Sequence, residues 1–181
     1  FEKNKLYLFV VLQNRFNPTL HKLKEAIDKG RFGKIYLSSV NVFWNRPQLY
    51  YDLDLWRGTK KLDGGALMNQ SSHYVDLMSW LLGPVSKIHS FCKILARKIE
   101  VEDTCVVNLQ FQNGTLGSLN VTTLNFDKNY EGSITIIGEN GTVKVAGTAL
   151  NNIVDWNFKD KLAEDHNIYD LNYDISNVYG F

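Results

Sequence analysis

Three polar residues at regular spacing are the strongest candidates for chemistry in this sequence. Asn69, His73 and Asp76 stand at positions i, i+4 and i+7 of a segment with helical periodicity, so their side chains would share one stripe of a helix. Histidine exchanges a proton near neutral pH, and a carboxylate one turn away can fix its tautomer. The stripe indicates an active-site edge, although an ordinary solvated helix face accounts for the same spacing.

A metal site is a further interpretation of the stripe, and the ligand count disfavours it. A catalytic zinc ion normally has three protein ligands, whereas the stripe offers one histidine and one carboxylate. His21, His89 and His166 lie on other segments, without a convergent carboxylate motif. We expect no metal, and the absence of paired carboxylates or of a nucleophile and base motif disfavours a hydrolase.

The segment between Trp44 and Asp63 lacks periodicity and is aromatic and basic. A loop of this length in a compact domain is usually functional or disordered, and its aromatic content argues against disorder. Arg46 and Arg57 can hold a carboxylate or a diphosphate while aromatic rings cover a flat ligand, but a packed loop with surface arginines is equally consistent. The loop residues in question are Trp44, Arg46, Gln48, Tyr50, Tyr51, Trp56 and Arg57.

Two helices are predicted to carry or flank these residues. Thr19 to Lys29 has apolar residues at helical spacing, with Pro18 near its first turn and Gly30 as its stop. The second helix opens at Gly64-Gly65 and runs to Leu82, where Gly83 and Pro84 end it. Polar residues 159–181 show no clear periodicity and no closing element.

The remaining elements are predicted strands. The continuous apolar run of Lys5–Leu12 is typical of a buried strand, and Asn113-Gly114 and Asn140-Gly141 predict hairpins with positive φ at both turn positions. Strand, helix, strand, helix and then a run of hairpins predict an α+β domain: a largely antiparallel sheet with helices on one face. The predicted strands after the first are Ile35–Phe43, Val85–Leu95, Glu102–Gln112, Thr115–Leu124, Glu131–Ile137, Thr142–Ala146 and Ile153–Phe158.

The composition narrows the class of protein. With 181 residues and 44% hydrophobic content the chain can bury a core, and its net charge of +1 makes nucleic acid an unlikely partner. The apolar run near the start is too short to span a bilayer, so we expect no membrane association and a cytoplasmic location. Cys92 and Cys105 lack CxxC spacing and are expected to be reduced core thiols, although a disulfide between neighbouring strands is possible.

At this point the sequence resembles the C-terminal half of the glucose-fructose oxidoreductase / inositol dehydrogenase / MocA family, from about residue 6 to about residue 158. Within the family, NVFWNRPQLYYD at 41–52 and MNQ at 68–70 look most like the dehydrogenases of lipopolysaccharide O-antigen synthesis that oxidise C3 of UDP-N-acetylglucosaminuronate. The segments that carry the wider resemblance are QNRFNP at 13–18, GRFGKI at 30–35, WRGT at 56–59, DGGALMNQSSHYVD at 63–76 and LLGPV at 81–85.

The resemblance implies a substrate-binding domain with a dihydrodipicolinate-reductase-like fold that works beside a separate Rossmann domain holding NAD or NADP. The family pattern GG-x-L-x-D-x-x-x-H-x-x-D places His73 beside the transferred hydride and matches Asp76. Its first acid is Asn69 here, which cannot be a base but can bond a sugar hydroxyl. Neither the G-x-G-x-x-G fingerprint nor the family's E-K-P lysine occurs in the sequence.

The resemblance also sets the expected organisation. Residues 1–13 would be the last strand or linker of the dinucleotide-binding domain, 14–158 the substrate-binding and oligomerisation domain, and 159–181 a truncated tail. A homo-oligomer through the open sheet face is expected. The residues expected to bind substrate are Arg15, Arg46, Gln48, Tyr50, Trp56, Arg57, Asn69 and His73; Asn14 and Arg15 are expected to touch the cofactor; and His73, Asn69 and Asp76 are the catalytic candidates.

Two alternatives remain open. A non-catalytic module that binds or assembles nucleotide sugars would keep Arg46 and Arg57 useful and make His73 replaceable. A relative that acts on another sugar or polyol would share the fold and the histidine. The chain alone is expected neither to bind NAD tightly nor to turn over substrate.

Overall fold

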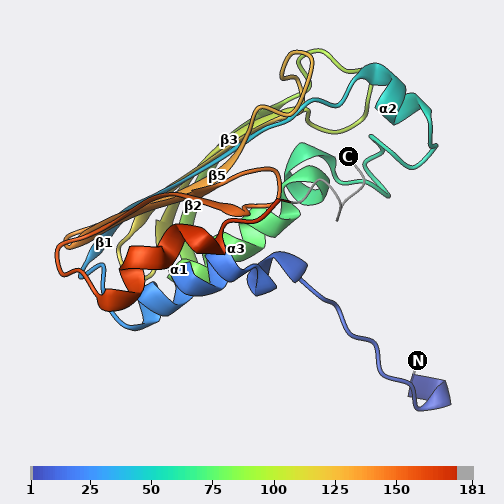
Figure 1. Cartoon of the computed structure of the whole chain (residues 1–181). Coiled ribbons are helices and arrows are strands. Elements are labelled where there is room, and N and C mark those ends of the chain that lie inside the picture. Colours follow the sequence, from blue (N-terminus) through green and yellow to red (C-terminus); the bar gives the residue numbers. More distant parts are fainter. Residues whose placement is uncertain (1, 175–181) are drawn as a thin grey trace.

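The computed structural model describes residues 2–174 and shows one seven-stranded sheet with helices along one of its faces (Figure 1). The strand order is β2-β3-β4-β1-β5-β6-β7, and every neighbouring pair is antiparallel except β1 and β4, which are parallel. This confirms the predicted α+β class with a largely antiparallel sheet. The strands are β1 (Ile35–Phe43), β2 (Val85–Lys93), β3 (Thr104–Phe111), β4 (Leu116–Thr122), β5 (Glu131–Gly138), β6 (Gly141–Ala146) and β7 (Asn152–Phe158).

The helices divide into two that cover the sheet and several short turns. The covering helices are α1 (Pro18–Asp28) and α3 (Ser72–Leu82). The bounds of α1 match the predicted segment to within one residue at each end, whereas α3 ends where predicted but begins well after Gly64-Gly65. Gly30 and Gly83, both with positive φ, follow the ends of the two helices. The short elements are 3₁₀ turns η1 (Glu2–Asn4), η2 (Gln13–Phe16) and η4 (Ala163–Leu171), the π turn η3 (Ala66–Gln70) and the one-turn helix α2 (Gln48–Asp52).

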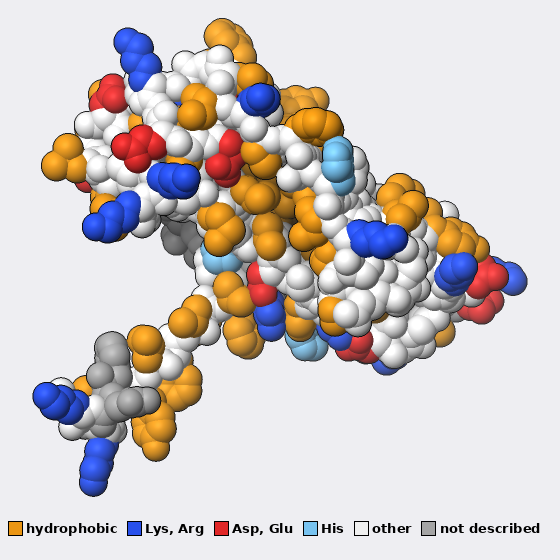
Figure 2. Space-filling model, turned by 180° about the vertical axis from the view of Figure 1, so that it is seen from behind, with side chains coloured by type: hydrophobic (Ala, Val, Ile, Leu, Met, Phe, Trp, Pro, Cys, Tyr) orange, Lys and Arg blue, Asp and Glu red, His pale blue; other side chains and the backbone are white. Residues whose placement is uncertain are grey.

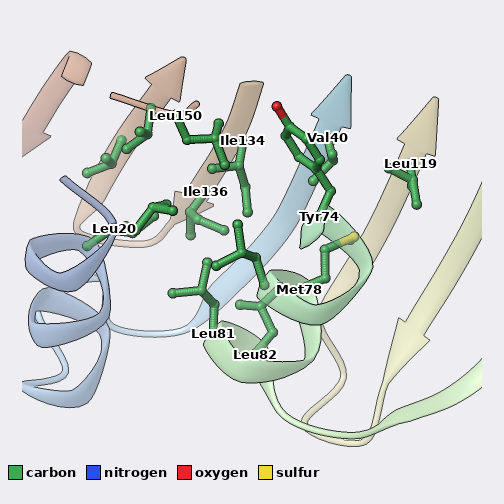
Figure 3. Packing of buried hydrophobic residues seen from close by; sticks show 14 of the residues in the cluster. Leu20, Val40, Tyr74, Met78, Leu81, Leu82, Leu119, Ile134, Ile136 and Leu150 are labelled. Atoms are coloured by element: carbon green, nitrogen blue, oxygen red, sulfur yellow. The ribbon is translucent and has the colours of Figure 1, made fainter. Parts of the chain in front are cut away.

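The core lies between these helices and the sheet (Figure 3). On α3 the apolar residues recur at i, i+3, i+4 and i+7, so one face of the helix is buried against β1, β4 and β5. Leu20 and Leu23 of α1 are fully buried in the same layer. The buried residues of α3 are Tyr74, Leu77, Met78, Leu81 and Leu82.

The N-terminus of α1 is anchored by side chains rather than by a capping hydroxyl. Pro18 fits the first turn because its missing N–H would have no helical partner. Asn17 Nδ2 donates to the carbonyl oxygen of Ala149 at 2.6 Å, and Thr19 Oγ1 donates to that of Leu150 at 2.6 Å. These bonds tie α1 to the loop that precedes β7.

The opposite face of the sheet is open and largely polar. Side chains that alternate with the buried ones pair across the strands: Ser118 Oγ lies 3.3 Å from Ser39 Oγ, and Asn120 Nδ2 donates to Asn41 Oδ1 at 3.0 Å. The expectation of helices on one face only is confirmed. Among residues 2–174, no helix is long and apolar enough to cross a membrane.

The two hairpins form as predicted, but their turn conformations differ. Asn113-Gly114 joins β3 to β4, and Asn140 lies between β5 and β6. Of the four turn residues only Gly114 has a positive φ, of 86°. In the second turn the backbone instead bonds outside the hairpin, because the Asn140 N–H donates to the carbonyl oxygen of Phe32 at 2.9 Å.

The predicted strand at Lys5–Leu12 is wrong for this structure. The segment has no regular structure and runs away from the domain, with its apolar side chains exposed (Figures 1 and 2). Tyr7 is 86% exposed and Val10 is 83% exposed. A strand needs a neighbour for its backbone groups, and no described strand pairs with this run.

The chain after β7 contains more structure than its composition predicted. The turn η4 packs against β7 with Ile168 buried, and Asp165 accepts hydrogen bonds from Arg31 and from Trp156 Nε1. The Arg31–Asp165 ion pair is well shielded, since the two side chains are 9% and 12% exposed. Up to residue 174 the tail is thus more ordered than its lack of periodicity predicted, and the end of the chain, where no closing element was expected, lies in residues 175–181, outside the described part.

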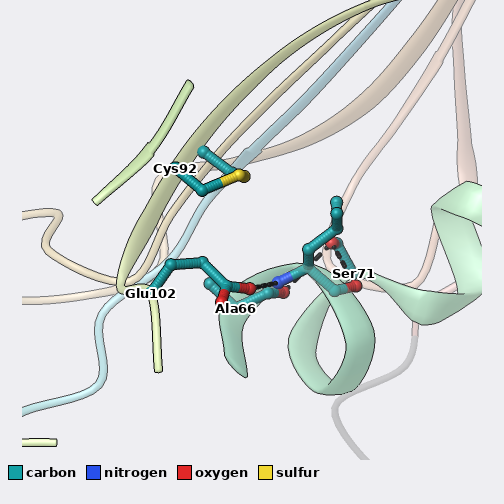
Figure 4. Close-up of a disulfide and its surroundings, with 6 residues drawn as sticks. Ala66, Ser71, Cys92 and Glu102 are labelled. Carbon is teal, nitrogen blue, oxygen red and sulfur yellow. Dashed lines mark hydrogen bonds between the residues drawn. A yellow bond between two sulfur atoms is a disulfide. The ribbon is translucent and has the colours of Figure 1, made fainter. Parts of the chain in front are cut away.

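The expectation of reduced thiols is also wrong, because Cys92 and Cys105 form a disulfide. The prediction of reduced thiols rested on the expected cellular compartment and not on geometry. In the structure the register of β2 on β3 places the two cysteines directly opposite each other, with Cα atoms 4.2 Å apart. The bond lies close to Ala66 and Glu102 (Figure 4).

The ion pair below η4 predicts an acid-sensitive step in stability. The hydrogen bonds from Arg31 hold the pKa of Asp165 well below its ordinary value. In the unfolded chain the pKa of an Asp carboxyl is about 3.9. The stabilisation that the Arg31–Asp165 ion pair gives to the folded state is therefore complete above about pH 5, and it is lost as the pH falls towards the pKa of Asp165 in the folded protein. Replacing Asp165 by Asn should lower the free energy of unfolding by about 2–3 kcal/mol at pH 7.

Thermal or urea unfolding of the wild type and the Asp165→Asn variant at pH 7 and pH 3 measures this difference. The exposed Asp160→Asn variant is the matched control, with little expected effect at either pH. An equal loss for both variants, or a loss for Asp165→Asn that does not shrink in acid, would contradict the assignment.

Candidate functional site

The segment expected to be one continuous helix from Gly65 to Leu82 is two elements. The π turn η3 ends at Gln70, Ser71 leaves helical geometry with φ −111° and ψ 12°, and α3 then begins. Glu102 holds the start of the turn, since its backbone oxygen accepts from Ala66 N at 3.0 Å and its Oε1 accepts from Leu67 N at 3.0 Å (Figure 4). Turns of this kind are frequent at functional sites.

Asn69 lies on the π turn and is oriented by an acid that sequence reasoning did not single out. Its Nδ2 donates to Asp63 Oδ1, while Asp63 Oδ2 accepts the backbone N–H of Gly58 at 2.7 Å. With one N–H of the amide engaged, Asn69 keeps its second N–H as a donor and its Oδ1 as an acceptor for a ligand hydroxyl.

His73 opens the first turn of α3 at the rim of the core. Its Nε2 lies 3.2 Å from Gln13 Nε2, and its Nδ1 is buried without a hydrogen-bond partner in the described structure. The next residue, Tyr74, points the other way, is 2% exposed and has an unpartnered hydroxyl whose pKa is raised by burial. One ring nitrogen of His73 is therefore held beside Gln13, and the other is buried without a partner in the described structure.

The spacing had suggested that Asp76 fixes the tautomer of His73, but in the structure Asp76 bonds another residue. Its two carboxylate oxygens accept from Nε and Nη2 of Arg15, with the Nε bond at 2.8 Å. Arg15 was predicted to bind substrate and cofactor, and in the structure this bidentate pair pins η2 against α3. Asn14, the other cofactor candidate, is 9% exposed in the same turn.

The aromatic-basic loop folds into a cluster in which arginines stack on rings. The Arg46 guanidinium lies 5.2 Å from the centre of Trp44 and 5.4 Å from that of Tyr50, and Arg57 lies 4.2 Å from Tyr50 and 5.5 Å from Trp56. Tyr50 therefore lies between two cations. This brings five of the predicted loop residues together.

The cluster holds more positive than negative charge. Arg57 pairs with Asp54 at 2.8 Å, while Arg46 Nη1 donates only to neutral oxygens, those of Asn45 and Asn129. Among the described residues Arg46 has no carboxylate partner, and burial lowers its pKa from the ordinary value. A partly desolvated guanidinium without a counter-ion is a site for an anionic ligand.

The cluster is linked to the π turn and to a neighbouring loop. Gln70 Nε2 donates to Tyr50 Oη at 3.1 Å. The side-chain amide of Gln48, which was predicted to bind substrate, is hydrogen-bonded within the protein. Its Oε1 accepts from Lys98 N at 2.8 Å, and its Nε2 donates to Asp52 Oδ1 at 2.9 Å. Its role here is to hold α2 in place.

Asp103 is a supporting residue that sequence reasoning missed. Its buried carboxylate accepts backbone N–H groups of Leu95, Ala96 and Arg97 at 3.0–3.1 Å. Burial opposes ionisation, yet these bonds keep the pKa of Asp103 below its ordinary value. The loop it folds delivers Arg97 Nε to the carbonyl oxygen of Arg46 at 2.7 Å. An Asp beside a turn-rich stretch was the available signal.

Two cavities flank the cluster and share Asn129. A groove of about 540 Å³ runs beside Arg46, and a smaller hollow of about 160 Å³ lies beyond Trp44. His73 lines neither of them. No group of three potential metal-ligating side chains occurs within residues 2–174.

Residues 20–144 match the GFO/IDH/MocA C-terminal domain, and the chain belongs to this family. The WlbA dehydrogenase from Chromobacterium violaceum, solved with NADH and UDP-GlcNAcA, is 55% identical with a TM-score of 0.89, covering 94% of this chain and 50% of that one. The Bordetella pertussis WlbA dehydrogenase, solved with the same ligands, is 53% identical with a TM-score of 0.92, covering 99% of this chain and 52% of that one.

A more distant relative is the myo-inositol 2-dehydrogenase of Thermotoga maritima, 26% identical over 147 residues that cover 78% of this chain and 42% of that protein. The chain thus spans about half the length of the solved relatives and less than half of the curated one.

The role of Asp103 as a folding centre for the loop behind Arg46 gives a testable expectation. Replacing it by Asn leaves one acceptor oxygen for three N–H donors, so the free energy of unfolding should fall by about 2 kcal/mol. Hydrogen exchange at residues 95–97 should accelerate more than exchange in β1. The exposed Asp155→Asn variant on β7 should change neither quantity, and unchanged exchange at 95–97 in Asp103→Asn would refute the role.

Proposed function

We propose that this chain is the substrate-binding part of an NAD-dependent dehydrogenase that oxidises a nucleotide-sugar hydroxyl, C3 of UDP-N-acetylglucosaminuronate (UDP-GlcNAcA). The observation that carries the proposal is the arginine pair on Tyr50, which has an unmatched positive charge suited to a diphosphate. The WlbA dehydrogenases, more than half identical to this chain, were solved with that ligand.

A chain of aromatic contacts from the arginines towards α3 supports this proposal. Arg46 stacks on Trp44, Trp44 meets Tyr74 edge-on at 6.1 Å, and Tyr74 adjoins His73 on α3. A diphosphate at the arginines would direct the sugar past Trp44 towards His73. We assign Arg46, Arg57, Tyr50 and Trp56 to the diphosphate end.

His73 and Asn69 act at the sugar end in this proposal. His73 accepts or returns the proton of the reacting hydroxyl, and Oδ1 of Asn69 accepts a hydrogen bond from a sugar hydroxyl. Asp76 acts through Arg15, which holds η2 and Gln13 beside the histidine. Gln48 is a supporting residue rather than a ligand contact.

The residues present fit only the edge of a nicotinamide cofactor. The described elements include no glycine-rich turn between a strand and a helix to receive its phosphates. Gln13, Asn14 and Arg15 would border the nicotinamide, which supplies the hydride acceptor when bound. We propose that residues 1–13 lead from the dinucleotide-binding domain and that residues 14–158 form the substrate domain. We also propose that the protein works in the cytoplasm.

A chimera tests the catalytic assignment. Joining this chain to the N-terminal half of the Chromobacterium violaceum relative should give NAD reduction with UDP-GlcNAcA, while the chain alone should give none. His73→Ala should lower kcat of the chimera by about 10²–10⁴-fold, the range of general acid–base catalysis. Arg46→Met should act mainly by raising KM.

The chimera's outcomes separate the candidates. Full activity of the His73→Ala chimera, with UDP-GlcNAcA still bound, would favour a non-catalytic binding module. Activity on another sugar or polyol alone would favour a sibling enzyme.

We also propose that the chain self-associates through the open face of the sheet. Beside the paired polar residues, this face exposes apolar side chains: Leu116 is 55% and Phe91 65% exposed, on the same side as Ser118 and Asn120. Water-exposed apolar area beside paired polar groups is typical of subunit interfaces.

Light scattering at tens of micromolar should report at least twice the 20.8 kDa of one chain. Leu116→Arg should shift the particle towards one chain, because it buries a charge in the interface. Leu55→Arg is the control, because Leu55 is 98% exposed and lies in the aromatic-basic loop, away from the sheet face. A single-chain mass for the unaltered protein would refute the interface.

A further inference from the structure

The Cys92–Cys105 disulfide lies where the loop between β2 and β3 leaves the sheet. We call this loop, residues 94–103, the brace loop. Cys92 and Cys105 face each other one pair before the end of the β2–β3 ladder, and Asp103 N donates to the carbonyl oxygen of Lys93 at 3.2 Å. The covalent bond therefore closes the brace loop at its base, in addition to the backbone ladder.

The brace loop holds both parts of the site. Arg97 Nε donates to the carbonyl oxygen of Arg46 at 2.7 Å, and Glu100 N donates to the carbonyl oxygen of Gly58 at 2.8 Å. At the other end of the loop, beside the disulfide in Figure 4, Glu102 accepts the two N–H groups that begin the π turn η3. A displacement of the brace loop would thus move the arginine cluster and the π turn together.

The two cysteines differ in their freedom to move. Cys105 is 0% exposed and lies on β3, which pairs with a strand on each side. Cys92 is exposed and lies on β2, the edge strand of the sheet. Once the bond is cut, the two sulfur atoms must separate to van der Waals contact. Cys92 and the end of β2 are then the parts that can yield, and the brace loop begins there.

Cys92 also stays accessible if copies of the chain associate through the open face. Side chains alternate between the two faces of a strand, so Cys92 points to the side of its partner Cys105, in the core layer, while Phe91 points to the open face. The sulfur of Cys92 is therefore the one that a thiolate from solution can reach.

The proposed cytoplasmic location gives this bond a meaning beyond stability. Cytoplasmic thiols are kept reduced, and the disulfides that do form there are usually transient and either catalytic or redox-sensing. Cys105 is buried in the core and lies outside the proposed catalytic residues, which leaves the sensing role.

We propose that Cys92 and Cys105 form a redox switch that sets how firmly the brace loop holds the arginine cluster. The disulfide form is the rigid state, in which Arg46 is held ready for an anion, and the dithiol form is the loose state. The inference rests on the proposed function for the anion site and adds a form of regulation to it.

Opening of the switch is a thiol–disulfide exchange with a dithiol reductant of the thioredoxin class. A thiolate of the reductant attacks Sγ of Cys92 and forms a mixed disulfide, and Cys105 leaves as a thiolate that takes up a proton. The second thiolate of the reductant then attacks its own half of the mixed disulfide and releases Cys92, which is protonated in turn. Two electrons and two protons reach the protein, and the reductant leaves as a disulfide. Closing is the reverse exchange, with a small disulfide as the oxidant.

Hydrogen exchange and calorimetric titration with pyrophosphate, on the oxidised chain and on the chain reduced by dithiothreitol, test the switch. Alkylation followed by mass spectrometry should find no free cysteine before reduction and two after it. Exchange at residues 95–100 should accelerate about tenfold on reduction, because the loop loses its covalent closure, while exchange in β1 stays unchanged. Pyrophosphate should bind about three- to tenfold more weakly, since Arg46 is less well positioned.

Cys92→Ser is the matched variant, because it replaces the exposed sulfur and leaves no bond to reduce. Without any reductant it should show the faster exchange and the weaker pyrophosphate binding of the reduced chain. Dithiothreitol should then change neither quantity, which controls for effects of the reagent itself.

The outcomes separate this inference from the proposed function. Unchanged exchange and affinity after reduction of both cysteines would overturn the switch and leave the arginine site standing. An equal effect of dithiothreitol on Cys92→Ser, or two free thiols that persist in excess oxidised glutathione, would also overturn it. Failure of pyrophosphate to bind in either state would count against the arginine site and thus against the proposed function, while the exchange rates would still decide the switch.

Discussion

The burial of one face of α3 against the sheet is the constraint on which the site depends. Tyr74, Leu77 and Met78 are held in the core, so the helical period leaves His73 and Asp76 at its rim, facing η2. Loss of that packing would displace His73 and break both its contact with Gln13 and the contact between Trp44 and Tyr74. The chemistry of the rim is therefore positioned by residues that never meet a ligand.

Periodicity and turn residues made much of this fold predictable. The bounds of β1 and the extent of α1 follow from local alternation and from stop signals such as Gly30, which act over a few residues. The helix that carries His73 and Asp76 was predicted for the same reason. A local pattern, however, does not show a π turn, so the change of helix type before Ser71 and the separation of Asn69 from His73 were not foreseen.

What the sequence did not reveal depends on partners far along the chain. Asp76 was matched with its near neighbour His73, yet it bonds Arg15, 61 residues away, because chain folding brings a stronger bidentate partner. The disulfide followed from strand register in the same way. The partners of Asp103 are backbone N–H groups, which any residue type supplies, so its position beside a turn-rich stretch was the only signal and did not identify them.

The outstretched run from Leu6 to Leu12 bears on how the chain behaves at high concentration. It holds seven consecutive apolar residues with neither charge, proline nor glycine, and none of the described strands pairs with its backbone. Such a peptide can template identical copies into stacked, cross-β assemblies. Shielding of this run by a neighbouring domain would thus protect against fibril formation as well as complete a fold.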